Sequence, residues 1–185
     1  MKKITITALS IFFLFFTFHF DENVETARKI VKDFSKILKS ELTTGMRNGG
    51  AVNAISVCSV KAPEIAKQLS DSTDWQVGRT SLKIRNIKNK PDEWEKTVLE
   101  KFENELKEGT DVKTLEYSET VEENGVKYFR YMKAIPTGGV CLNCHGSKIK
   151  EPVKKKIEEL YPEDKAVGFK KGDIRGAFTL KKKLD

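Results

Sequence analysis

Apolar residues near the start of the chain recur every three or four positions, a pattern typical of an amphipathic helix. These positions predict a helix from Val24 to about Met46 and are Val24, Ala27, Ile30, Val31, Phe34, Ile37, Leu38 and Leu42. Gly49 and Gly50 predict a break after it. We expect a second helix over residues 51–57 and a third over 62–69, with Pro63 in its first turn.

The second half of the chain shows mostly the alternation that is typical of strands. It predicts a strand over 75–82, a helix over 91–109, strands over 115–121 and 126–135, a charged helix over 151–160 and a strand over 176–180. Glu123-Asn124-Gly125 predicts the turn of a hairpin. Helices followed mostly by strands indicate an α+β fold with an antiparallel sheet, in one domain over residues 22–185.

The N-terminal segment has the pattern of an export signal. Residues 4–20 are almost wholly apolar and follow Lys2 and Lys3. Thr17-Phe18-His19-Phe20 lacks the small residues of a cleavage site, and a run of 17 residues is at the short edge of what spans a bilayer. Residues 1–20 are therefore interpreted as a signal peptide or as an N-terminal membrane anchor through 4–20. Both place the body of the protein in the periplasm.

Charge says little about partners. Without residues 1–20 the basic count falls from 34 to 32 against 27 acids, so the net charge falls from +7 to +5. Lysine runs at 154–156, 170–171 and 181–183 are interpreted first as solvated surface. The alternative is docking to an acidic redox partner or to anionic lipid. No nucleic-acid partner is expected, because no basic motif is interleaved with aromatic residues.

Cys141-Leu142-Asn143-Cys144-His145 is the most specific motif of the chain. C-x-x-C-H is the covalent attachment site of a c-type haem, in which two thiols bind the porphyrin. The adjacent histidine then ligates the iron. The chain has two histidines, and His19 lies in the N-terminal segment. The motif therefore predicts one covalently bound haem c, with no second imidazole from the same chain on the iron.

The two cysteines have three other interpretations. A thioredoxin-type C-x-x-C opens a helix after a strand, whereas this motif follows a Pro-Thr-Gly-Gly turn and precedes Gly146. A zinc site needs four ligands, and adjacent Cys144 and His145 make an awkward tetrahedral pair. A disulfide between Cys141 and Cys144 is the simplest alternative in an exported protein.

The ligand on the far face of the iron is open from chemistry alone. Cys58 is left over once haem takes two of the three cysteines, and an odd thiol in an oxidising compartment needs an explanation. Met46 ends the first predicted helix, and methionine is a common partner in electron-transfer cytochromes. Met132 lies in a predicted strand, where core packing is the simpler role. Cys58, Met46 and an open or weakly ligated site remain as alternatives.

Several segments together resemble a known family of exported single-haem c-type proteins, first described in a cyanobacterium, with a PAS-like fold and His/Cys ligation. The segments are residues 54–66, 79–86, 89–95, 141–145 and 168–178, in this order. The resemblance implies a PAS-like antiparallel sheet with a long N-terminal helix and flanking helices. It also implies that Cys58 ligates the iron opposite His145. Related domains form sensory parts of membrane-bound histidine kinases and chemoreceptors.

The expected function is a periplasmic redox or small-gas sensor module that works with a separate signalling protein or redox partner. The alternative is a periplasmic electron-transfer cytochrome c. A homodimer through the helix at 24–46 is a further expectation for a sensory domain. An enzyme is not expected, because a peroxidase would need an assisting residue on an open face. The arginines are interpreted as propionate partners or surface residues: Arg79, Arg85, Arg130 and Arg175.

Overall fold

The computed structural model describes residues 21–184. In chain order its elements are α1 (Glu22–Asp71), β1 (Trp75–Thr80), the 3₁₀ helix η1 (Ile87–Asn89), α2 (Glu93–Lys107), β2 (Glu116–Glu123), β3 (Val126–Pro136), the 3₁₀ helix η2 (Gly139–Cys141), α3 (Leu142–His145), α4 (Glu151–Leu160) and β4 (Ile174–Lys183). The signal peptide or anchor predicted at 1–20 lies outside the described residues. Within 21–184 no helix is both long and apolar enough to cross a bilayer.

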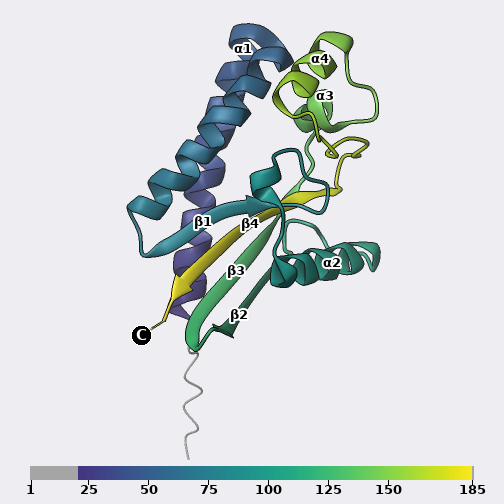
Figure 1. The fold of residues 1–185 in the computed structure, drawn as a ribbon. Helices are drawn as coiled ribbons and strands as arrows, with labels where there is room; N and C mark the ends of the chain where they lie inside the picture. The colour runs from purple at the N-terminus through teal and green to yellow at the C-terminus, as the bar shows by residue number, and fades with distance from the viewer. Residues whose placement is uncertain (1–20, 185) are drawn as a thin grey trace, which may run out of the picture.

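The four strands form one antiparallel sheet in the order β1-β4-β3-β2 (Figure 1). In its centre Tyr131 of β3 is paired with Leu180 of β4. The hairpin between β2 and β3 turns at Asn124 and Gly125, which both have positive φ values of 52° and 78°. Asn-Gly suits such a turn because both residues tolerate the left-handed region. The predicted α+β class, with an antiparallel sheet and a long N-terminal helix, is confirmed.

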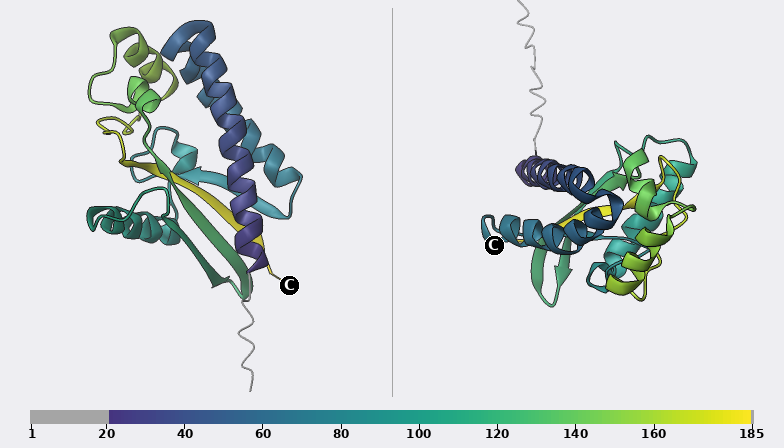
Figure 2. Two further views of the ribbon diagram at one scale, coloured as in Figure 1. Left: turned by 180° about the vertical axis from the view of Figure 1, so that it is seen from behind. Right: turned by 90° about the horizontal axis from the view of Figure 1, so that it is seen from above.

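Alternating residues of the strands pack against different helices. Phe129 and Tyr131 of β3 join a cluster with Ile30 and Phe34 of α1. Their neighbour Met132 joins a second cluster, with Leu99 of α2. Because successive side chains of a strand point to opposite faces, α1 and α2 cover the two faces of the sheet. Figure 2 shows the first half of α1 lying along the strands.

Helix α1 is bent back on itself at Gly49 and Gly50, as the two glycines predicted. Gly50 has a φ of 64°, and the side chain of Asn53 donates a hydrogen bond to the carbonyl of Gly45 at 3.1 Å. The prediction of separate helices at 51–57 and 62–69 is wrong, because the helix continues through Pro63 to Asp71. Proline removes one backbone donor. Burial on both sides of it, at Ala54, Ile55, Ala62 and Ile65, supports one continuous helix.

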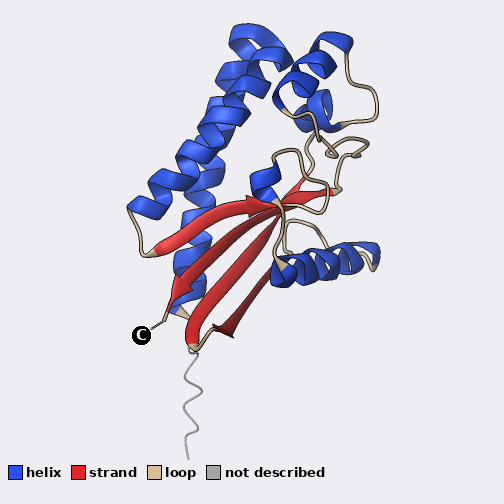
Figure 3. Cartoon of the chain, in the orientation of Figure 1, coloured by secondary structure: helices blue, strands red, loops and turns tan. Residues whose placement is uncertain are grey.

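Other helices and strands begin or end a few residues away from the predicted positions (Figure 3). The first strand ends at Thr80 and the last strand is longer than expected, at Ile174–Lys183. Pro91 precedes α2 and is not in its first turn. The helix begins after Asp92, whose carboxylate accepts from the backbone of Glu95 at 2.8 Å, while the Glu95 side chain accepts from the backbone of Asp92. This reciprocal pair is a capping box, which fixes the start of a helix.

The short helix α3 and the helix α4 lie beside the bend of α1, away from most of the sheet (Figure 1). A small apolar cluster joins them, with Ile55 of α1 against Val153 and Ile157 of α4. Ala51 of α1 and Cys144 of α3 pack against this cluster. The packing therefore brings the second half of α1 to the C-x-x-C-H motif.

Candidate haem site

The C-x-x-C-H motif occupies a single tight turn between β3 and α4. The turn begins as η2 and continues as α3, and the backbone of Gly146 closes it by donating to Leu142 at 3.1 Å. Thr137, just before the turn, is held on both sides, since its amide donates to Asp173 at 2.8 Å and its carbonyl accepts from Gly172 at 3.0 Å. A side chain at Gly146 would lie 2.7 Å from the Leu142 oxygen, so only glycine fits there.

Both cysteines of the motif are free, half-buried thiols. The disulfide alternative is therefore not formed. The thioredoxin alternative lacks its long helix, because α3 has four residues, and its parallel βαβ context, because the sheet is antiparallel. No group of three histidine, cysteine or acidic side chains within residues 21–184 is arranged to hold a metal ion by itself.

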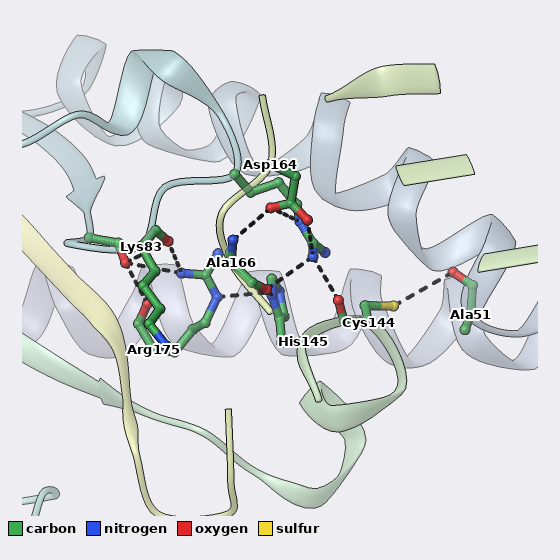
Figure 4. A network of polar contacts seen from close by, with 9 residues as sticks. Ala51, Lys83, Cys144, His145, Asp164, Ala166 and Arg175 are labelled. Carbon is green, nitrogen blue, oxygen red and sulfur yellow. Dashed lines mark hydrogen bonds and ion pairs between the residues drawn. The ribbon is translucent and has the colours of Figure 1, made fainter. Parts of the chain in front are cut away.

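The imidazole of His145 is held in one orientation by its neighbours. Its Nδ1 lies 2.8 Å from the carbonyl oxygen of Ala166, which can only accept a hydrogen bond, so Nδ1 carries the proton and Nε2 keeps a lone pair (Figure 4). The ring of Phe169 meets the imidazole edge-on at 6.1 Å. Burial, followed by the charges of Arg175 and Arg85, lowers the pKa of His145 to about 2. The imidazole is therefore neutral, which is the form that binds metal.

Arg85 fixes the segments on either side of His145. Its guanidinium binds both carboxylate oxygens of Asp164, at 3.0 and 2.9 Å, and this ion pair is almost fully buried. The same group donates to the carbonyls of Cys144 at 2.7 Å and Ala166 at 3.1 Å. Asp164 in turn accepts from the backbone of Ala166 at 2.8 Å. One ion pair thus links the loop after β1, the motif, and the segment that orients His145.

Cys58 lies in the second half of α1, in the same electrostatic surroundings as His145. Burial raises the pKa of its thiol, and the charges of Arg79, Arg85 and Arg175 act in the opposite direction. The same three arginines act on His145. Cys144 packs against the cluster that contains Ile55, which lies one turn before Cys58 in α1, and Cys58 raises the pKa of Cys144. The structure therefore brings together the three cysteines and the histidine that the sequence singled out.

The other predicted ligand and propionate candidates lie partly at the site and partly elsewhere. Met132 is fully buried between the sheet and α2, in the core role that was its simpler interpretation. Met46 lies in α1 just before the bend. Arg130 belongs to a different place, because its guanidinium faces Asp92 and Glu95 between the sheet and the start of α2. Of the four arginines considered, only Arg79, Arg85 and Arg175 lie at the site.

Arg175 contacts the imidazole of His145 directly. Its Nε donates to Nε2 of His145 at 3.3 Å, and its Nη1 donates to the hydroxyl of Ser81 at 3.2 Å. Burial, together with the charges of Arg85 and Arg79, lowers the pKa of Arg175 to about 10. The guanidinium remains charged at neutral pH and lies against the nitrogen that would ligate iron.

Sequence reasoning missed Asp164 and Ala166, which orient the motif from a loop about twenty residues later. Nothing in the local sequence marks them: an acidic residue after Tyr161-Pro162 is typical of any surface loop. Arg85 gives no signal either, because it lies in the polar segment 83–90, and only the structure shows that it is buried and requires an acidic partner.

Comparison with known proteins gives the family. The family model described as Tll0287-like, Tll0287, matches residues 19–182. The chain therefore belongs to the Tll0287-like family. A solved member of similar fold is described as the cyanobacterial heme-protein Tll0287, with a TM-score of 0.68 and 24% sequence identity. The match covers 89% of this chain and 97% of that one. No curated protein matches this Tll0287-like chain.

Proposed function

We propose that this Tll0287-like protein is a periplasmic c-type monohaem protein, with one haem c attached through Cys141 and Cys144. His145 and Cys58 would be the axial ligands of its iron. The observation that carries the proposal is the arrangement of His145, with Nδ1 bound to the Ala166 carbonyl and Nε2 left with its lone pair. The solved relative is a heme-protein, which supports the same cofactor.

The residues of the site fit this group in three ways. Two free thiols in one turn match the attachment chemistry of C-x-x-C-H. A neutral imidazole supplies the nitrogen ligand, and a thiol from α1 supplies a sulfur ligand. Three arginines lie around His145, and within residues 21–184 the one carboxylate paired with them is that of Asp164, so the site suits a cofactor that carries carboxylates. When bound, haem supplies one-electron redox chemistry and an iron that takes a sixth ligand.

Sensing is the role that we favour for this site. The two proposed ligands are held by different elements: His145 is fixed by the Arg85 and Asp164 ion pair, whereas Cys58 lies on a helix that also runs past the bend toward the N-terminus. A thiolate binds ferric iron more strongly than ferrous iron, so reduction favours release of Cys58. Release would free the helix and open the site to a diatomic gas, which is a shift of population between two states.

The surface gives less support to the electron-carrier alternative. A carrier needs an unpaired charged patch for docking, but several lysines of the predicted basic runs face nearby acids. These pairs are Lys154–Glu158, Lys156–Glu159, Lys181–Glu123 and Lys182–Asp74. A solvated, internally paired surface is the better interpretation. The sensor would then act through a separate signalling protein, as a monomer or as a homodimer through α1.

The experiment that tests the cofactor is expression of the full chain with a c-type haem maturation system. A pyridine haemochrome spectrum should show about one haem for each chain. The double variant Cys141→Ser/Cys144→Ser should lose covalent haem, while Met46→Ala should keep it. If the wild type and the double variant are equally free of covalent haem, the proposal is wrong.

The sensing role is tested on the loaded protein by reduction under carbon monoxide. Release of Cys58 predicts a carbon monoxide complex with a changed visible spectrum in the reduced state, and none in the oxidised state. Fast, reversible voltammetry with no ligand change, and no carbon monoxide complex, would support the electron carrier instead.

A further inference from the structure

Arg175 links the proposed iron ligand His145 to the loop that follows β1. Its Nε binds Nε2 of His145 at 3.3 Å, and its Nη1 reaches the Ser81 hydroxyl at 3.2 Å and the Lys83 carbonyl at 3.4 Å (Figure 4). Its guanidinium also lies 5.3 Å from the centre of the Phe169 ring. One end of the group is therefore held by the loop after β1, and the other end by the histidine.

The contact with His145 is incompatible with the proposed ligation. Nε2 of a neutral imidazole protonated at Nδ1 has a single lone pair, which either accepts a hydrogen bond or binds a metal. When His145 ligates iron, Arg175 must give up this bond. The charge is then left in the site with only Ser81, Lys83 and the Phe169 ring as its known partners.

The local charge balance shows what kind of partner would replace the histidine. Three arginines act on His145, and Asp164 is paired with Arg85 through both of its oxygens. Among the ion pairs of residues 21–184, none includes Arg79 or Arg175. A half-buried cation without an acidic partner is costly, and a carboxylate that forms two parallel hydrogen bonds is the preferred partner of arginine. The two carboxylates that haem brings would satisfy this need.

We propose that Arg175 is a positioning residue with two successive partners. In the haem-free protein it holds Nε2 of His145, and in the loaded protein it binds a carboxylate of the haem. This inference rests on the proposed function. Arg175 suits the role better than its neighbours, because Arg85 is already bound to Asp164, and Arg79 lies 5.7 Å from the Phe34 ring, facing α1.

The test on the loaded protein compares Arg175→Gln with Arg175→Lys, and with Arg47→Gln as an exposed arginine of α1. Arg175→Gln should keep covalent haem but lower the reduction potential, because a positive charge near the iron favours the ferrous state. It should also shift the resonance Raman band of the haem propionates, which responds to their hydrogen bonds. Arg175→Lys should recover most of the potential, and Arg47→Gln should leave both readouts unchanged.

The haem-free full chain gives a second, independent measurement. His145 and His19 are the only histidines, so nitrogen-15 NMR of the imidazoles can assign His145 by comparison with His145→Ala. Arg175→Gln should change the Nε2 shift and leave Nδ1 protonated. The inference is overturned if wild type and Arg175→Gln share the same Nε2 shift, or the same potential and propionate band. Absence of covalent haem from the wild type would overturn the proposed function, whereas unchanged readouts in Arg175→Gln would overturn only the role of Arg175.

Discussion

The carbonyl of Ala166 accepts the Nδ1 proton of His145 at 2.8 Å, and this single contact decides which nitrogen is available for a metal. Ala166 is itself fixed by Asp164 and Arg85. The imidazole is therefore oriented by a chain of polar contacts that ends in a buried ion pair. Such outer contacts orient metal-binding histidines and adjust their strength as ligands.

Asp164→Ala should destabilise the protein by about 3 kcal/mol, because it leaves the Arg85 cation buried and unpaired. Urea unfolding of the haem-free protein, followed through the buried Trp75, measures the loss. Asp71→Ala is the matched control, since its pair with Lys67 is exposed and is worth less than about 1 kcal/mol. Equal losses in the two variants would show that the Arg85 pair does not support the site.

Gly176→Ala should destabilise by about 1–3 kcal/mol, because a methyl group there would lie 2.4 Å from the carbonyl oxygen of Thr80. Gly176 also has a φ of 154°, which other residues rarely adopt. The clash lies beside Arg175, which belongs to the candidate haem site. The variant should therefore also attach less haem. Gly78→Ala is the control, since its methyl group would make an ordinary contact at 3.5 Å. Comparable stability and haem content in both variants would contradict this reasoning.

Glu116 should make stability depend on pH. Burial alone would raise its pKa, but hydrogen bonds from Arg28 and Tyr131 outweigh burial and lower the pKa to about 2. An unfolded glutamate titrates near about 4.3. The carboxylate therefore stabilises the fold fully above about pH 5, and this contribution is lost as the pH falls toward 2.

Glu116→Gln should thus cost about 2 kcal/mol at pH 7, after allowing for partial exposure of the side chain, and progressively less between pH 5 and 2. Urea unfolding at several pH values checks the difference. Glu122→Gln, at an exposed neighbour on β2, should show no such change. A gap between wild type and Glu116→Gln that stays constant from pH 7 to 3 would rule out this linkage.

The sequence predicted the parts of this protein that depend on neighbouring residues. The helical repeat from Val24, the Asn124-Gly125 turn and the C-x-x-C-H motif are all local patterns. The continuous helix through Pro63 was not predicted, because burial on both sides of the proline outweighs its local cost. The contacts of His145 were not predicted for a similar reason. They join residues that are far apart in the chain, as Arg85 and Asp164 are.

The same distinction applies to Cys58. Chemistry alone left Met46 and an open site as alternatives, and the family resemblance implied the cysteine. The structure places Cys58 among the arginines that surround His145. In the proposed function, its half-buried position on α1 would connect ligation of the iron to movement of a helix.

Electron paramagnetic resonance of the ferric, haem-loaded protein, measured beside Cys58→Ala and Met46→Ala, tests the central claim most directly. His145/Cys58 ligation predicts a low-spin thiolate signal in the wild type that persists in Met46→Ala and disappears in Cys58→Ala, with covalent haem retained in all three. A Cys58→Ala spectrum identical to that of the wild type would contradict the account and make Cys58 a packing residue.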